Sequence, residues 1–192
     1  KGALRDLLRG TASCSPFLKS LIERENDWLA TAFDQTDLVI ENELDRIKSV
    51  PLDQIAVELR RAKKRIALWS GLCDISGVYD LAQVTKALTD FADLAVETAL
   101  QAALTKLIRR GKLPGFQDGA VLADTGIFVL AMGKMGAFEL NYSSDIDLIV
   151  FFDEAKFDPE VFHQARSTFI KATREMAATL SDLTGDGYVF RT

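Results

Sequence analysis

Apolar side chains recur at helical spacing through most of residues 1–111, which predicts a series of amphipathic helices. One helix is expected to begin at Ser15-Pro16, because serine caps a helix N-terminus and proline fits the first helical position. Its apolar stripe consists of Phe17, Leu18, Leu21, Ile22, Trp28, Leu29 and Phe33. Three further helices are expected at 37–48, 52–74 and 80–110. Residues 1–111 are therefore predicted to form a helical region.

The hydrophobic period changes after a turn-rich connector at 112–125. Short apolar runs at 127–131 and 148–152 predict two strands, and Asp158-Pro159 is expected to open a helix that ends near residue 183. A last strand is expected at 188–191. An order of strand, turn, strand, helix and strand suits an α/β or α+β core. We take α+β as the fold class, with a helical region at 1–111 and a mixed core at 112–192.

Residues with potential chemistry concentrate between the two predicted strands. A glycine-bearing turn at 133–136 precedes Ser143-Ser144 and then Asp145-Ile146-Asp147. Asp145 and Asp147 are two positions apart, so on an extended strand both carboxylates point to the same face. Two carboxylates at a sheet edge beside a glycine turn can hold a divalent metal against a phosphate. The alternative is that the aspartates only cap the entry to the strand.

The remaining residues of this segment also allow two interpretations. Gly133 and Gly136 would let the backbone approach a phosphate, or would simply form a tight turn between strands. Ser143 and Ser144 could donate hydrogen bonds to phosphate oxygens, or could cap the turn. Lys134 could neutralise phosphate charge, or could be solvated.

The motif resembles that of the DNA polymerase β-type nucleotidyltransferase superfamily, because the aspartates open the apolar strand and ten residues separate Lys134 from Asp145. Lys134 stands where the wider superfamily has glycine or serine. The longer segment GKMGAFELNYSSDIDLI resembles the signature of the glutamine synthetase adenylyltransferase/adenylyl-removing family, whose members have two catalytic halves. Asn141 and Ile146, together with the segments 3–29, 58–77 and 185–192, favour the N-terminal, adenylyl-removing half.

The resemblance implies a polymerase β-type nucleotidyltransferase core at 112–192. It implies phosphorolytic removal of AMP from an adenylylated tyrosine of glutamine synthetase, with release of ADP. Asp145 and Asp147 would be the catalytic residues and the ligands of Mg²⁺ or Mn²⁺, and Gly133, Lys134, Gly136, Ser143 and Ser144 would bind phosphate or nucleotide. The implied partners are glutamine synthetase, a PII-type signal protein, ATP or ADP, and phosphate, in a bacterial cytoplasm.

The resemblance also places a third metal-binding carboxylate just after the predicted strand at 187–191, beyond Thr192. The chain is therefore expected to be an incomplete core that is inactive alone. Two other functions stay open: the half that transfers AMP from ATP to glutamine synthetase, and a non-catalytic docking or regulatory module. Arg191, at the end of the last predicted strand, either faces the active site or is structural.

Charge and composition exclude several function classes. A net charge of −5 argues against a nucleic-acid duplex as substrate. No apolar stretch approaches the roughly 18 residues of a membrane span. His163 is the chain's only histidine, so a Ser-His-Asp triad or a histidine-rich zinc site lacks its residues. A basic run, Arg60, Arg61, Lys63, Lys64 and Arg65, is either a solvated helix face or a docking surface for an acidic partner or nucleotide.

Overall fold

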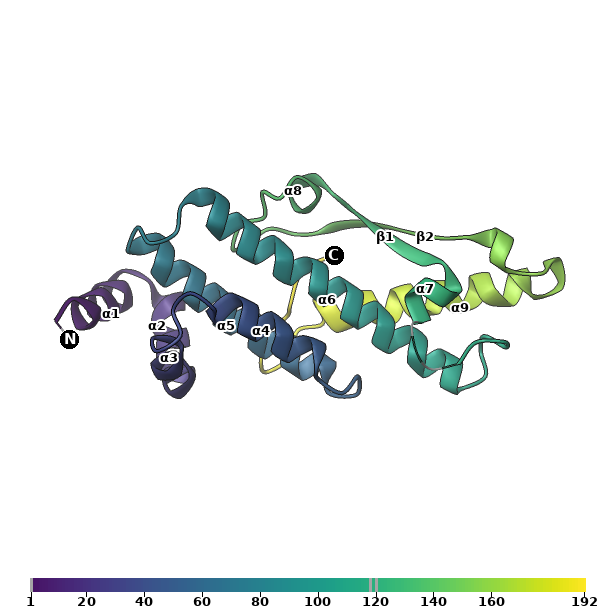
Figure 1. Cartoon of the computed structure of the whole chain (residues 1–192), viewed down its shortest axis with the longest axis horizontal. Coiled ribbons are helices and arrows are strands. Elements are labelled where there is room, and N and C mark those ends of the chain that lie inside the picture. Colours follow the sequence, from purple (N-terminus) through teal and green to yellow (C-terminus); the bar gives the residue numbers. More distant parts are fainter. Residues whose placement is uncertain (1, 118, 120) are drawn as a thin grey trace.

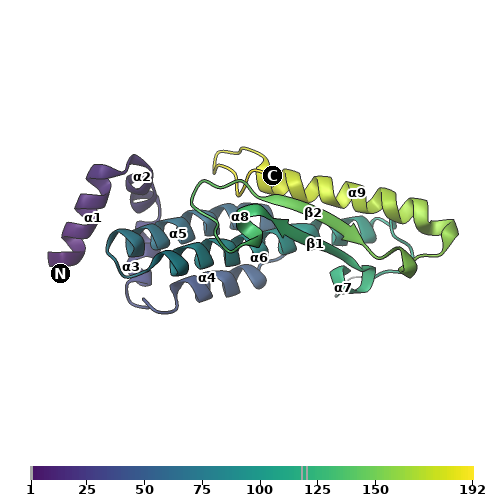
Figure 2. The same cartoon turned by 90° about the horizontal axis from the view of Figure 1, so that it is seen from above.

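Helix α6 (Leu81–Arg109) runs through the middle of the molecule in the computed structural model, which describes residues 2–117, 119 and 121–192. Helices α4 and α5 lie along one side of α6, and α9 and a small sheet lie along another (Figures 1 and 2). The other helices of this region gather at the N-terminal end. The bounds are α1 (Gly2–Cys14), α2 (Pro16–Arg24), α3 (Asn26–Ala32), α4 (Val39–Lys48), α5 (Ile55–Ile75) and α9 (Pro159–Ser181).

Local capping signals place the starts of α2 and α6 where they were expected. Ser15 accepts a hydrogen bond from the Leu18 backbone N–H at 3.2 Å, and Pro16 is the first residue of α2. Asp80 and Gln83 form a reciprocal capping box at the start of α6. The predicted stripe after Ser15 is wrong in one respect, because the chain breaks at Glu25 between α2 and α3.

The sheet consists of two antiparallel strands, β1 (Ile127–Met132) and β2 (Asp147–Phe152), whose register runs from Ile127 opposite Phe152 to Met132 opposite Asp147. One face packs towards the core, and its partly buried residues include Val129, Ala131, Leu148, Val150 and Phe152. The other face leaves Phe128, Leu130, Met132, Ile149 and Phe151 exposed. Short elements flank the strands: α7 (Val121–Thr125), α8 (Gly133–Gly136) and the 3₁₀ helix η1 (Glu154–Lys156).

The strand predicted at 188–191 is wrong, because within the described residues the sheet has two strands. Residues 188–191 instead lie beside the C-terminal end of α9, where the backbone N–H groups of Val189 and Phe190 both donate to the Leu180 carbonyl. It reaches the sheet end through one hydrogen bond, from the Ile146 N–H to the Arg191 carbonyl at 2.9 Å. The fold is mostly helical α+β, and the polymerase β-type core stays a prediction.

The main hydrophobic core crosses the boundary that was predicted at residue 111. Its fully buried members include Phe91 and Leu104 of α6, Leu180 of α9, and Phe190. Helices α5, α6 and α9 therefore share this core with the sheet, whereas α2 and α3 pack against α5 in a second cluster that includes Leu18, Leu29 and Leu68. The division into two domains at residue 111 stays a prediction. None of the helices in the described part of the chain has the length and apolar character that a membrane crossing requires.

Candidate functional site

The turn after β1 needs both of its glycines for backbone reasons. Gly133 has a φ of +58°, a left-handed conformation that side chains disfavour. A Cβ on Gly136 would collide with the carbonyl oxygen of Ala131. The tight-turn interpretation of Gly136 is therefore sufficient by itself, and phosphate binding at this residue stays a prediction.

The two candidate carboxylates lie at the end of the sheet where this turn is formed. Asp145 and Asp147 are exposed, whereas Ile146 between them is only 2% exposed, as expected of alternating positions on an extended chain. Asp147 begins β2, and the position that a Cβ would take on Gly133 is 3.4 Å from its Oδ2 atom. The structure thus brings the glycine turn and the Asp147 carboxylate together.

Arg191 joins this cluster from the C-terminal segment. Its Nε atom lies 2.5 Å from Oδ1 of Asp145, and its Nη2 atom donates to the Ser143 carbonyl at 3.0 Å. The side chains of Arg191 and Asp145 are 57% and 61% exposed, so solvent screens this ion pair. Of the two interpretations of Arg191, the structure favours the one that places it at the candidate site.

The two serines have different surroundings. Ser144 donates to Oδ1 of Asn141 at 2.8 Å, and its hydroxyl accepts from the Asn141 backbone N–H at 3.2 Å. Ser144 therefore caps the loop, which is the structural one of the two roles considered for it. The backbone N–H of Ser143 also donates to Oδ1 of Asn141. Lys134 is exposed and has no ion-pair partner among the described residues, so its charge is available to a ligand.

The donor set suits a divalent cation only in part. Carboxylate oxygens are the ligands that Mg²⁺ and Mn²⁺ prefer. In the described part of the chain, no three Asp, Glu, His or Cys side chains come together in a metal-binding cluster. Asp145 and Asp147 could therefore supply two carboxylates to a metal site, and their role as ligands stays a prediction.

The basic run on α5 is not a free cationic surface. Arg60 is 5% exposed and donates to the carbonyls of Gly187 and Asp182, at 2.9 and 2.7 Å. Three further members of the run form ion pairs with carboxylates: Arg61 with Glu58, Lys64 with Asp186, and Arg65 with Glu25 and Glu43. Sequence analysis missed that Arg60 and Lys64 fasten the 182–187 segment to α5, since partners more than 120 positions away leave no local signal.

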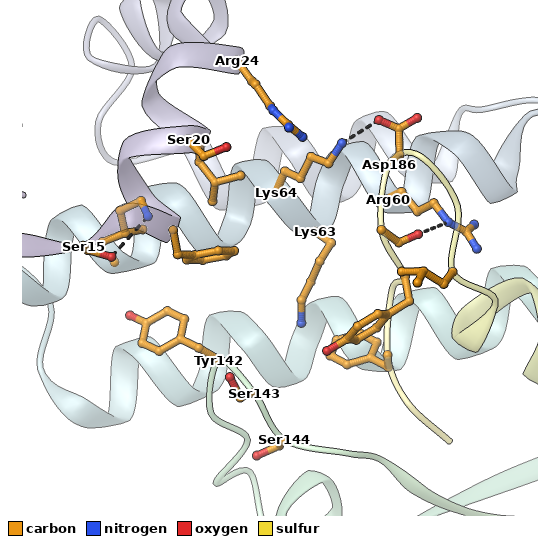
Figure 3. Close-up of a pocket in the computed structure, with 18 of the residues that line it drawn as sticks. Ser15, Ser20, Arg24, Arg60, Lys63, Lys64, Tyr142, Ser143, Ser144 and Asp186 are labelled. Atoms are coloured by element: carbon orange, nitrogen blue, oxygen red, sulfur yellow. Dashed lines mark hydrogen bonds and ion pairs between the residues drawn. The ribbon is translucent and has the colours of Figure 1, made fainter. Parts of the chain in front are cut away.

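A pocket of about 730 Å³ opens next to this cluster, between α2, α5, the 142–144 loop and the 183–190 segment (Figure 3). It shares Ser143 and Ser144 with the loop that leads into Asp145. Four cationic side chains line it: Arg24, Arg60, Lys63 and Lys64. Sequence analysis did not predict this pocket, because its walls come from four separate parts of the chain.

Comparison with known proteins adds independent information on this arrangement. The family model described as glutamate-ammonia ligase adenylyltransferase matches residues 6–192. Bifunctional glutamine synthetase adenylyltransferase/adenylyl-removing enzymes from Bradyrhizobium sp. strains BTAi1 and ORS 278 are 42% and 40% identical over 100% and 99% of this chain. The enzyme of that name from Rhizobium meliloti strain 1021 is 34% identical over 98% of it. The chain spans about a fifth of the length of these relatives, 20% in each case.

Proposed function

Because this chain belongs to the glutamate-ammonia ligase adenylyltransferase family, we propose that it carries part of the centre that removes AMP from adenylylated glutamine synthetase. The proposed reaction is a phosphorolysis that releases ADP and restores the free tyrosine. The observation that carries the proposal is the pair of exposed carboxylates, Asp145 and Asp147, beside the Gly133 turn. Glutamine synthetase would be the protein substrate, and a PII-type signal protein a regulatory partner.

Asp145 and Asp147 would hold Mg²⁺ or Mn²⁺, together with donors from elsewhere in the protein. The metal would neutralise charge on the phosphoryl group that is transferred. The residues of this chain would position the reactants: the carboxylates fix one side of the site, and Lys134 adds a positive charge near the turn. Arg191 would balance the charge of the Asp145 carboxylate when no metal is bound, since it contacts that carboxylate and the Ser143 carbonyl.

The chemical step needs little from acid–base groups. An oxygen of inorganic phosphate forms a bond to the AMP phosphorus, the bond from that phosphorus to the tyrosine oxygen breaks, and the tyrosine takes up a proton. Phosphate is already an anion at neutral pH, so catalysis depends mainly on positioning and on charge stabilisation. The cluster around Asp145 contains no histidine, which agrees with a reaction that needs no strong general base.

Two residues support the removing reaction over the transfer of AMP from ATP. Asn141 and Ile146 match the removing half in the resemblance described above. Asn141 holds the loop before the aspartates through its side-chain oxygen, and Ile146 anchors that loop in the core. Both residues therefore shape the approach to Asp145.

The test replaces one carboxylate in the full-length protein and follows both reactions. Asp147→Asn should abolish phosphate-dependent ADP release from adenylylated glutamine synthetase and leave ATP-dependent adenylylation intact. Asp158→Asn is a matched control, because Asp158 is exposed and its side chain caps nothing. Loss of adenylylation instead would assign the chain to the other catalytic half. Normal rates of both reactions would show that this segment is a non-catalytic module.

A further inference from the structure

Lys63 is a member of the basic run whose ammonium ends in the pocket and has neither a carboxylate nor a carbonyl partner among the described residues. Its ammonium nitrogen lies 3.9 Å from the centre of the Phe190 ring, and no carboxylate among the described residues pairs with it. Figure 3 shows its side chain reaching from α5 into the middle of the pocket, with Tyr142 on one side. Burial lowers its pKa to about 8. A partly buried ammonium without a carboxylate partner among the described residues marks a place where an anion would be stabilised.

Most of the charged side chains around Lys63 in the pocket already have partners. Lys64 pairs with Asp186 at 2.6 Å, and the Tyr142 hydroxyl donates to Asp74 at 3.3 Å. The acids that line the pocket therefore have partners of their own. Arg24, at the end of α2, points towards the same opening and forms no ion pair with the described residues (Figure 3).

The pocket also gathers apolar side chains that the chain leaves uncovered. Phe17, Ile75, Leu183 and Tyr188 all line it, and each is among the large apolar side chains with a high exposed fraction. Exposed aromatic and aliphatic surface around a concave opening is typical of a ligand site. The volume of about 730 Å³ lies within the range of about 300–1,000 Å³ that small-molecule sites occupy.

We propose that this pocket binds a small organic phosphate with a flat ring, whose phosphate contacts Lys63 and whose ring packs against Phe17 and Tyr188. The hydroxyls of Ser20 and Ser143 line the same pocket and are available to phosphate oxygens. Binding here needs no metal. The inference goes beyond the proposed function, because Asp145 and Asp147 do not line the pocket, although the pocket shares Ser143 and Ser144 with the loop that leads into Asp145.

The experiment uses 1-naphthyl phosphate as the probe, the full-length protein, and EDTA to remove divalent metal. Calorimetric titration should show saturable binding, and inorganic phosphate or 1-naphthol alone should bind at least about tenfold more weakly, since each supplies one kind of contact. Lys63→Met should weaken probe binding by about tenfold or more, because it removes the cation that would contact the phosphate. Lys63→Arg should retain most of the affinity.

Three further variants make the result decisive. Phe17→Ala should weaken binding without unfolding the protein, because Phe17 is exposed. Lys19→Met, on the same helix but outside the pocket, should change nothing. Asp147→Asn should also leave binding unchanged, so failure at the carboxylates and failure at this pocket are distinguishable.

Several outcomes would overturn the inference. These are no binding of the probe, equal binding by Lys63→Met, and binding that needs Mg²⁺ and disappears in Asp147→Asn. Binding of an acidic peptide that depends on Lys63, in the absence of probe binding, would identify the pocket as a protein-docking site and would also overturn it.

Discussion

Arg191 lies against Asp145, with 2.5 Å between its Nε atom and the Oδ1 atom of the carboxylate. The same guanidinium donates to the Ser143 carbonyl, 48 positions earlier in the chain. This contact puts a fixed positive charge on one of the two carboxylates that we propose as metal ligands. The pair therefore connects the C-terminal segment to the candidate site, and it makes Arg191 a competitor for the cation.

Removal of that charge should make metal binding tighter. Arg191→Met is expected to raise the affinity of the full-length protein for Mn²⁺ by a few fold, because an exposed ion pair contributes only about 0–1 kcal/mol. Titration calorimetry with Mn²⁺ measures the change, and Arg166→Met on α9 is the control. Weaker Mn²⁺ binding by Arg191→Met would mean that Arg191 positions Asp145 for the metal rather than competing with it.

The glycine turn should be sensitive to a single methyl group. Gly136→Ala is expected to reduce the free energy of unfolding by roughly 1–3 kcal/mol, because its Cβ would collide with the Ala131 carbonyl. Gly185→Ala is the matched control, since a Cβ there meets nothing within 4 Å. Urea denaturation compares the two variants. Equal stability of Gly136→Ala and the wild type would show that the turn relaxes at little cost.

Arg60 should be structurally important although it belongs to a run of cations. Arg60→Met leaves the carbonyls of Gly187 and Asp182 without their donor, so a loss of roughly 1–3 kcal/mol in unfolding free energy is expected. Arg61→Met removes an exposed contact with Glu58 and should cost no more than about 0.5 kcal/mol. Denaturation of both variants tests the difference. Similar stabilities of the two variants would show that the hydrogen bonds of Arg60 contribute no more to stability than the exposed contact of Arg61.

Lys63 should give the protein a measurable dependence of stability on pH. Its pKa falls from the ordinary value of 10.5 to about 8 in the folded chain because of burial. Between these two values the unfolded chain binds more protons than the folded chain, so the free energy of unfolding should rise with pH. The rise should be clearest from pH 8 to 9, since burial also raises the pKa of Cys73 to about 11, which opposes it at higher pH.

The comparison that isolates this effect is Lys63→Met against the wild type, with urea denaturation at pH 7, 8 and 9. As pH rises, the free energy of unfolding of the wild type should increase relative to that of Lys63→Met. A difference that stays constant with pH would show that Lys63 keeps its ordinary pKa in the folded protein.

The sequence alone determined the features of this fold that depend on interactions between near neighbours along the chain. Ser15 starts α2 and Asp80 starts α6, because the side chain and backbone that form each cap are within three residues of one another. The two-residue spacing of Asp145 and Asp147 predicted that both would be exposed while Ile146 between them is buried, because successive side chains alternate on an extended chain. These features depend on near neighbours, so a pattern along the chain can show them.

Only the tertiary structure decided how the distant segments meet. The apolar run at 188–191 could have been a strand, but its N–H groups bond to the end of α9 and Arg191 turns to Asp145. The basic run looked uniform in the sequence, yet Arg60 binds carbonyls 122 and 127 positions away, while Lys63 lies over the Phe190 ring in a pocket, with no carboxylate partner among the described residues. Hydrogen bonds and ion pairs between remote residues leave no periodic signal in the sequence, because folding alone brings those residues together.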